Sequence, residues 1–184
     1  MSIADPRTIL RVAGRLCKDP TDLLADFPHG GTALGLIASA EFTPVMTRAE
    51  IRAEEYGGEI VEVVEQAERV VFACVARGYD SDMLATLFRD TATGGGTGGI
   101  VVTNDSTRRG GELGSDSAVK LLYSPKDTEQ HTALLLYRAI PLTDPTIQMQ
   151  MSIGEELGIA AVFTGIRDAT DRIYQWGRLE DLTL

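Results

Sequence analysis

Residues 48–77 read RAEIRAEEYGGEIVEVVEQAERVVFACVAR, and this stretch decides the fold. It is rich in Val and Ile, which favour strands, and Gly57-Gly58 supplies the positive φ angles that a two-residue hairpin turn requires. We therefore expect strands at 48–56, 59–65 and 69–77, joined as a meander. The apolar residues between 60 and 71 also fit a helical stripe, but the β-branched side chains and the hairpin signal favour strands.

Segments of the same kind continue on both sides of this stretch. Further strands are expected at 34–46, 98–103, 117–123, 131–140, 145–151, 157–167 and 172–177. One helix is expected at 81–89, because Asp80 or Ser81 can cap it and apolar residues follow at helical spacing. That apolar face consists of Met83, Leu84, Leu87 and Phe88. The sequence thus predicts a mainly β fold, a β-sandwich or partly closed barrel with one short helix.

Three segments differ in composition from this core. Residues 1–33 are expected to form an N-terminal arm, since Pro20, Pro28 and Gly30-Gly31 interrupt any regular pattern there. Residues 104–118 are polar and glycine-rich, and their length exceeds that of a plain hairpin turn, so we expect a mobile loop. Residues 178–184 form a C-terminal tail that either docks on a neighbour or frays. A single β domain at 34–177 is expected between the arm and the tail.

The composition indicates a soluble globular protein. Of the 184 residues, 43% are hydrophobic and 24% are charged, which suits an average core. The net charge of −10 repels phosphate backbones, so a dedicated nucleic-acid-binding module is not expected. No apolar run approaches the roughly 18 residues that cross a bilayer, so we expect a chain made in the cytoplasm that does not associate with membranes.

The glycine run at 94–99 imitates a nucleotide-binding motif. Gly94, Gly96 and Gly99 have the spacing G-x-G-x-x-G. The dinucleotide fingerprint needs a strand before the glycines and a helix after them, so that the pyrophosphate meets the helix N-terminus. Here a helix is expected before the run and a strand after it. We therefore interpret the run as a connector and expect no nucleotide cofactor.

Cysteine and histidine are too rare for the usual catalytic and metal sites. Cys17 and Cys74 lie too far apart for a CxxC motif, and Cys74 lies in an apolar run typical of a buried side chain. His29 and His131 cannot build a three-histidine zinc site. Neither a metal, a cofactor nor a catalytic residue is expected, and the chain is not expected to be an enzyme.

Glutamates cluster between residues 41 and 68. The segment contains eight glutamates and only two basic residues, Arg48 and Arg52, which gives it a net charge of −6. In the expected strand register Arg48, Glu50, Arg52 and Glu54 point to one face, which is therefore wet and mainly acidic. A solubilising surface explains this pattern. A glycosidase pair of carboxylates would instead need a cleft with stacking aromatics, and aromatic residues make up only 6% of the chain.

The order of these segments resembles that of tail tube proteins of long-tailed bacteriophages and of the related secretion-system tubes. The resemblance rests on the strand that contains Gly35–Ala38, the acidic stretch Arg52–Gly57 turning into Glu59–Val64, the apolar Arg69–Cys74, and the helix Asp82–Phe88. It covers Gly35 to Phe88 well and the remainder of the chain in outline. It implies a β-sandwich or barrel with one helix beside it.

The resemblance further implies a structural virion protein. Hexameric rings of such subunits stack into a hollow tube, assembled in the host cytoplasm, through which DNA leaves the head without specific binding. The partners are then other copies of the chain, other tail proteins and the tape measure protein. An acidic lumen fits this role because carboxylates repel phosphate. The candidate lumen-lining residues are Glu50, Glu54, Glu59, Glu62, Arg48 and Arg52.

The loop at 104–118 supplies candidates for contacts between rings. Arg108 and Arg109 offer two cationic anchors, and Leu113 offers an apolar one. Three alternatives stay open. Another tail ring protein, such as a terminator, neck or distal-tail protein, would share this fold. A β-barrel that binds a small apolar ligand would be a stable monomer with a ligand-sized cavity, and an acid hydrolase is the third alternative.

Overall fold

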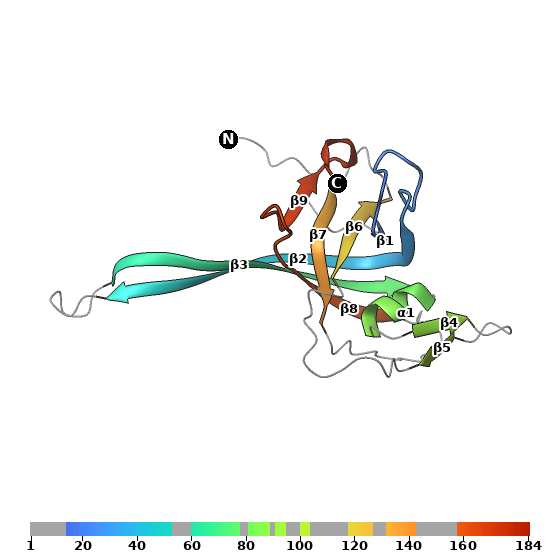
Figure 1. Ribbon diagram of the computed structural model, residues 1–184, viewed down its shortest axis with the longest axis horizontal. Helices are drawn as coiled ribbons and strands as arrows, with labels where there is room; N and C mark the ends of the chain where they lie inside the picture. Colours follow the sequence, from blue (N-terminus) through green and yellow to red (C-terminus); the bar gives the residue numbers. More distant parts are fainter. Residues whose placement is uncertain are drawn as a thin grey trace.

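The computed structural model describes residues 14–52, 60–77, 81–88, 91–94, 100–103, 118–126, 132–142 and 158–184. The elements are β1 (Gly14–Lys18), β2 (Thr32–Arg52), β3 (Ile60–Arg77), α1 (Ser81–Phe88), β4 (Thr91–Gly94), β5 (Ile100–Thr103), β6 (Val119–Pro125), β7 (Ala133–Pro141), β8 (Gly158–Gly165), β9 (Tyr174–Gly177) and the 3₁₀ turn η4 (Leu179–Asp181). Among these residues α1 is the one α-helix (Figure 1). The predicted mainly β fold with one short helix is confirmed.

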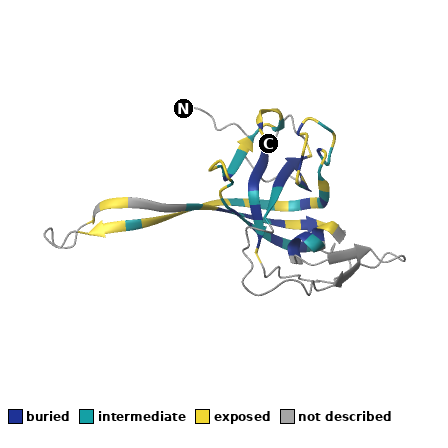
Figure 2. Ribbon diagram, in the orientation of Figure 1, coloured by how far each residue is buried: buried dark blue, intermediate teal, exposed yellow. Residues whose placement is uncertain are grey.

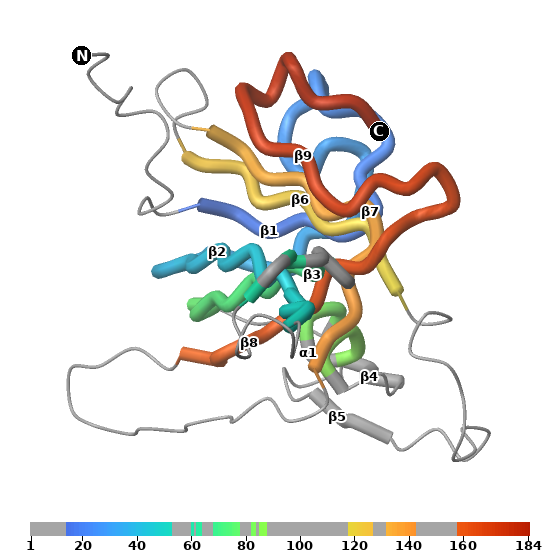
Figure 3. The backbone as a smooth tube through the Cα atoms, turned by 90° about the vertical axis from the view of Figure 1, so that its left-hand side faces the viewer, coloured from blue at the N-terminus to red at the C-terminus, as the bar shows by residue number. Residues whose placement is uncertain are grey.

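Seven strands form one antiparallel sheet in the order β6-β1-β2-β3-β8-β7-β9. β6 also pairs with β7, so six of these strands close into a ring and β9 is attached to it. The strand β7 allows both arrangements, because Ala133–Leu136 pairs with β9 whereas Ala139–Pro141 pairs with β8. Figure 3, viewed from the side of the long hairpin, shows β6, β1, β2, β3 and β8 one above another in the order of the sheet. Ring closure removes most of the free sheet edges that a flat sheet would expose.

The interior of the ring is filled with apolar side chains. Phe72 on β3 lies opposite Phe42 on β2 and Phe163 on β8, which places three aromatic rings in one row across the sheet. Phe72 and Phe163 are fully buried. The helix α1 adds Met83 and Leu87 to the same core, as its apolar spacing predicted. The helix boundaries agree with the expected 81–89 to within one residue.

A second apolar layer lies on the outer face of β1, β6 and β7. Successive residues of a strand point to opposite faces, so Leu122 and Leu135 face outward between neighbours that face the core. Leu23 from the loop after β1 and Leu182 from the C-terminal tail cover them. The loop and the tail therefore lie on the same side of the ring (Figure 1).

This second layer changes the expected domain organisation. Residues 14–18, which we placed in the N-terminal arm, form a strand between β2 and β6. They were missed because GRLCK is short, lacks a clear alternation of polar and apolar residues, and is close to Pro20. The tail 178–184 docks on its own chain, since Tyr137 Oη lies 2.9 Å from the carbonyl oxygen of Thr183 and Leu182 is buried. Neither a frayed tail nor docking on a neighbour is needed to explain its apolar residues.

The two long strands β2 and β3 form a hairpin that projects from the ring (Figure 1). Strand β1 pairs only with Thr32–Ile37 of β2, and β8 pairs only with Val70–Arg77 of β3. We call the outer part of this hairpin, Thr43–Arg52 with Ile60–Arg69, the β2–β3 arm. Figure 2 shows it as mainly exposed where it is described. It is a two-stranded ribbon attached to a folded body.

The structure has two long strands where we expected a meander of shorter ones. The strands predicted at 34–46 and 48–56 are one strand, and so are those predicted at 59–65 and 69–77. The register shifts at Thr47/Arg48 and at Ile51/Arg52, and such bulges let a strand continue through residues that disturb the alternation. The strand interpretation of 60–71 is thereby confirmed over the helical one. The predicted turn at Gly57-Gly58 lies outside the described residues.

The other expected strands correspond to observed ones with shifted ends. They are 98–103 for β5, 117–123 for β6, 131–140 for β7, 157–167 for β8 and 172–177 for β9. The strand expected at 145–151 lies outside the described residues. The short strand β4 was not predicted, and it pairs with β5. The glycine run therefore follows the strand β4 and not directly the helix that was expected before it, and the strand β5 follows the run as expected.

Candidate functional site

Three of the six lumen-lining candidates share one face of the arm. Arg48, Glu50 and Arg52 alternate along β2. The Glu50 carboxylate accepts hydrogen bonds from Arg52 Nη2 at 2.7 Å and from Arg52 Nε at 3.3 Å. Arg48 Nη2 lies 3.8 Å from Met46 Sδ. The exposed charges on this face are thus partly neutralised within the chain, and an exposed ion pair of this kind contributes less than about 1 kcal/mol to stability.

The other candidates are separated from these three. Glu62 lies opposite Ile51, so it points to the face of the arm that Glu50 does not share. Val63 is the residue opposite Glu50. Glu54 and Glu59 lie outside the described residues. The structure therefore groups Arg48, Glu50 and Arg52 and places Glu62 apart from them.

The arm also carries apolar side chains that no other part of the described chain covers. Ten large hydrophobic residues are exposed among the described ones, and four lie on the arm: Met46, Ile51, Ile60 and Val63, each between 46% and 50% exposed. A fifth, Trp176 on β9, is 47% exposed beside the base of the arm. Sequence reasoning used the apolar residues of this segment to choose between strand and helix, but it did not predict that they are exposed. The Ile and Val residues interspersed with Glu59 and Glu62 were the available signal.

The base of the arm holds three aromatic residues in contact, Phe42, Tyr174 and Trp176. Pro44 and Met46 follow Phe42 at alternate positions of β2 and point to the same face, and we call these five residues the root patch. Phe42 contacts Tyr174 edge-on with ring centroids 5.0 Å apart, and its centroid lies 6.0 Å from that of Trp176. Phe42 and Tyr174 also pack on the interior core. The patch is thus anchored in the body and exposed at Pro44, Met46 and Trp176.

A turn held by Asp168 precedes β9, the strand that carries Trp176. The Asp168 carboxylate accepts hydrogen bonds from the backbone N–H groups of Thr170 and Arg172, from the Thr170 hydroxyl and from Arg172 Nε. Partial desolvation acts to raise the pKa of Asp168, but these hydrogen bonds outweigh it and hold the pKa well below its usual range. The Arg172 guanidinium lies 4.0 Å above the centre of the Tyr137 ring, which ties the turn to β7.

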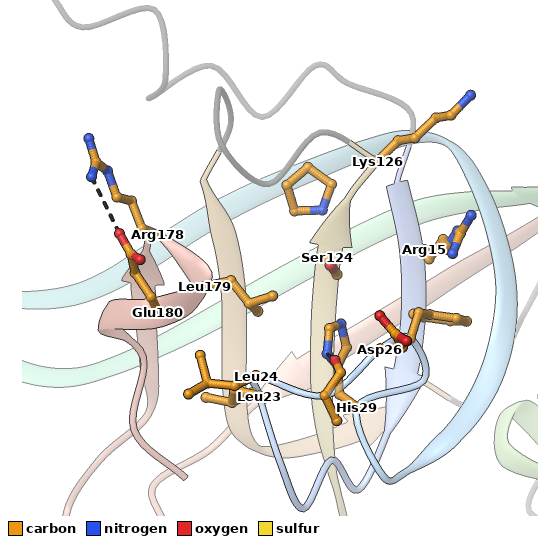
Figure 4. Close-up of a pocket in the computed structure, with 13 residues that line it drawn as sticks. Arg15, Leu23, Leu24, Asp26, His29, Ser124, Lys126, Arg178, Leu179 and Glu180 are labelled. Carbon is orange, nitrogen blue, oxygen red and sulfur yellow. Dashed lines mark hydrogen bonds and ion pairs between the residues drawn. The ribbon is translucent and has the colours of Figure 1, made fainter.

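A surface cavity of about 500 Å³ lies on the body (Figure 4). The loop after β1, the end of β6 and the C-terminal tail surround it. Its walls include Arg15, Lys126 and Arg178 as well as Asp26 and Glu180, so charges of both signs line it. Arg178 pairs with Glu180 at 3.4 Å. The charges select no single class of ligand.

His29 is the one buried histidine among the described residues, and it lines this cavity. Nδ1 lies 2.8 Å from the carbonyl oxygen of Ala25, which can only accept, so Nδ1 carries the proton. Nε2 has no hydrogen-bond partner in the described part of the chain and is shielded from solvent. A ligand in the cavity does not reach it. His29 therefore acts as a structural residue of the loop.

Both cysteines are buried free thiols. Burial, with a smaller contribution from the charge of Asp19, raises the pKa of Cys17 to about 11, and burial raises the pKa of Cys74 to about 12. Cys17 Sγ donates to the carbonyl oxygen of Pro28 at 2.8 Å. These features are typical of inert packing residues and not of nucleophiles.

Several residues singled out from the sequence lie outside the described part of the chain. They are the ring-contact candidates Arg108, Arg109 and Leu113, the glycines at 95–99, and His131. In the part that is described, no three His, Cys, Asp or Glu side chains gather in a way that could hold a metal ion. Nor is any of its helices both long enough and apolar enough to span a membrane.

Comparison with known proteins adds no relative. No family model matches this chain, and no curated protein was found to match it in sequence. The arm and its root patch are therefore the candidate functional site on physical grounds.

Proposed function

We propose that this protein is a self-assembling structural subunit of a bacteriophage tail, whose hexameric rings stack into the tube that conducts DNA. The observation that carries the proposal is the β2–β3 arm. Its parent strands have 21 and 18 residues, yet the body pairs only with their lower parts. The arm is far longer than the fold of the body requires.

The physical chemistry of the arm favours assembly over a monomeric role. A lone two-stranded ribbon is marginally stable in water, and its two outer edges expose unpaired backbone groups. Apolar side chains on it, such as Ile51 and Ile60, gain free energy only when a partner covers them. A neighbouring copy is the partner that is always present. Contacts between unlike surfaces of identical copies repeat, so they give rings or filaments.

The charge of the chain suits a conduit for DNA. A net charge of −10 repels phosphate, so DNA would pass through the tube without being held. No enzyme activity is part of this proposal. The partners are other copies of the chain, other tail proteins and the tape measure protein, and the location is the tail of the virion.

The interior of the ring argues against a β-barrel that binds a small apolar ligand. The position that such a ligand would take is filled by Phe72, Phe163, Tyr123 and other core residues. The cavity that we describe lies on the outer surface, and charged residues of both signs line it beside apolar ones. The assembly proposal is therefore the one that we develop.

Negative-stain electron microscopy of the purified protein, with sedimentation over a range of concentrations, tests the proposal. We expect rings or tubes that increase with concentration. Rings that never stack would favour a terminator, neck or distal-tail ring over a tube. A monomer at every concentration, in the presence and absence of other tail proteins, would contradict the proposal.

A further inference from the structure

Two arginines with a leucine between them form one row across the outer face of the sheet. Arg15 on β1 lies opposite Leu36 on β2, and Leu36 lies opposite Arg77 on β3. Residues directly opposite each other in antiparallel strands place their side chains on the same face, about 5 Å apart. All three side chains are exposed, and Leu36 is 57% exposed. An apolar group open to solvent therefore lies between two cationic ones.

A second surface cavity, of about 450 Å³, lies over this row. Its walls include Arg15, Leu36 and Arg77, together with Ala38 and Lys126. Lys126 belongs to the same face as Arg15, because Arg15 pairs with Ser124 and Lys126 lies two residues further along the chain. None of the described residues that line this cavity is acidic. Volumes of about 300–1,000 Å³ are typical of sites that bind small molecules.

The two cavities share Arg15 and Lys126 but differ in what accompanies them. In the cavity of about 500 Å³ described above, Asp26 and Glu180 lie among the same lining residues, whereas in the second cavity the two cations lie beside Leu36. Figure 4 shows both cationic side chains directed away from Glu180, which lies across the first cavity. Carboxylates of the chain therefore accompany these cations in the first cavity and not in the second.

The charges of Arg15 and Lys126 are not neutralised by ion pairs within the described part of the chain. The Arg15 guanidinium lies 5.2 Å from the centre of the Phe27 ring. Such a cation–π contact orients the guanidinium without removing its charge. Both side chains can therefore donate hydrogen bonds to an external anion.

A β-bulge shapes the apolar wall of the second cavity. Ile37 pairs with Ala76 and Ser39 pairs with Val75, so Ala38 has no partner on β3. Bulges bend a strand and redirect its side chains, and they are frequent beside binding sites. Here the bulge coincides with the point where Leu36 and Ala38 both line the cavity.

We propose that the second cavity binds a small organic anion, a carboxylate carried by an apolar chain. The carboxylate accepts charge-assisted hydrogen bonds from Arg15 and Lys126. The apolar chain covers Leu36 and Ala38, which removes their exposed surface from water. The net charge of −10 repels anions in general, so retention of one depends on cations gathered at one place. This inference goes beyond the proposed assembly and does not depend on it, because the cavity lies on the body and not on the arm.

Isothermal titration calorimetry with octanoate tests the proposal, at a protein concentration below that at which particles form. Three related probes separate the two parts of the ligand. Octan-1-ol keeps the apolar chain without the charge, octylammonium reverses the charge, and inorganic phosphate keeps a negative charge without the chain. We expect octanoate to bind, and we expect each of the others to bind about tenfold more weakly or worse, because each lacks one of the two interactions. Equal affinities for octanoate and octan-1-ol would contradict the proposal.

Variants of the cavity locate the bound octanoate. Leu36→Ser removes the apolar wall, and Arg15→Gln and Lys126→Gln each remove one cation. Each substitution should weaken octanoate binding by about fivefold or more, because apolar burial and charge-assisted hydrogen bonds both contribute. The three positions are exposed, so the fold should be retained, which circular dichroism checks. If Arg15→Gln unfolds the protein, Lys126→Gln still tests the role of the cations.

The first cavity supplies matched controls. Leu24→Ser changes a leucine that is 80% exposed and that lines the first cavity and not the second, so it is the control for Leu36→Ser. Arg178→Gln removes an exposed cation that also lines only the first of these two cavities, so it is the control for Lys126→Gln. Both control variants should bind octanoate as the unmodified protein does.

Three results would overturn the inference. The first is that octanoate does not bind. The second is that Leu24→Ser and Arg178→Gln weaken its binding while Leu36→Ser does not, since the ligand would then occupy the first cavity. The third is that a single-stranded oligonucleotide binds through Arg15 and Lys126 whereas octanoate does not, since these cations would then contact nucleic acid. None of these results bears on self-assembly, and a protein that stays monomeric would leave the octanoate site as it is.

Discussion

The Glu50 carboxylate and the Arg52 guanidinium form an ion pair on the arm, with 2.7 Å between Oε2 and Nη2. Their side chains are 47% and 61% exposed, so the pair contributes little stability. The ion pair matters more for the electrostatic field of this face than for stability. A face that we predicted as acidic carries Arg48 and Arg52 beside Glu50, so its net field is smaller than the number of glutamates indicates.

Reversing the charge of this face tests whether it lines the lumen. With Glu50→Lys and Glu54→Lys, Arg52 loses the carboxylate with which it pairs, and the face, which also carries Arg48, becomes strongly basic. Tubes should still form, but DNA ejection should slow, and it should slow most at low salt because salt screens the attraction to phosphate. Ejection rates at several ionic strengths measure this.

The control for that experiment is Glu180→Lys, which changes an exposed glutamate on the C-terminal tail, far from the arm in sequence and on another element. Ejection from tubes of this variant should be unaffected. If the arm variant ejects DNA at the normal rate at every ionic strength, the charged face of the arm is only a solubilising surface.

The strands were predictable from the sequence where local patterns decide them. The positions of β7, β8 and α1 were predicted to within a few residues, because β7 and β8 are apolar runs and α1 is amphipathic. The short β1 was not predictable, because what makes GRLCK a strand is its pairing with β2 and β6 on either side. The continuity of β2 and β3 was missed because bulges interrupt their alternation without ending the strands.

The candidate site was predictable only in part. The acidic character of the arm follows from composition. The root patch depends on Phe42 and Trp176, which are far apart in the sequence and meet because β9 attaches to β7 near the base of the arm. No local pattern contains that information, so only the tertiary structure reveals this patch.

The native thiols should be nearly inert in the folded protein. Burial raises the pKa of Cys17 to about 11 and that of Cys74 to about 12, so at pH 8 about one thiol in a thousand or fewer is ionised. Reaction with a thiol reagent should therefore be slow in native buffer and fast in denaturant. Fast stoichiometric reaction of the native protein would show that the two thiols are accessible and not buried.

The C-terminal tail should stabilise the body through Leu182. This side chain is 6% exposed and packs in the cluster that contains Leu122, Leu135 and Tyr137. Leu182→Ala should lower the free energy of unfolding by about 2–3 kcal/mol, which urea denaturation measures. Leu184→Ala, at a position that is 37% exposed, is the control and should change it by about 0.5 kcal/mol or less. Equal effects at the two positions would mean that the tail does not dock as described.

The turn at Asp168 should make stability depend on acid pH. Its pKa lies below the unfolded value of about 3.9, so its stabilising contribution is complete above that pH and is lost as the pH falls toward the folded value. Asp168→Asn should be less stable than the unmodified protein at pH 7, and the difference should shrink below about pH 4. Thermal denaturation across this range measures it, and a difference independent of pH would contradict the role of the carboxylate charge.

The arm should be dispensable for folding and essential for assembly. Val45 and Arg69 are cross-strand partners, so replacing residues 46–68 with Asn-Gly closes the shortened hairpin with a favoured turn and keeps the register below it. No described side chain in the removed segment is buried, whereas Phe72 and Val70 stay in the core. The shortened protein should therefore unfold cooperatively, with a melting temperature close to that of the full chain, and should stay monomeric in sedimentation. Trp176 emission reports whether the base of the arm is intact. Rings or tubes formed by the shortened protein would exclude the arm as the element of assembly, and an unfolded product would show that the arm belongs to the folding unit and is not an appendage.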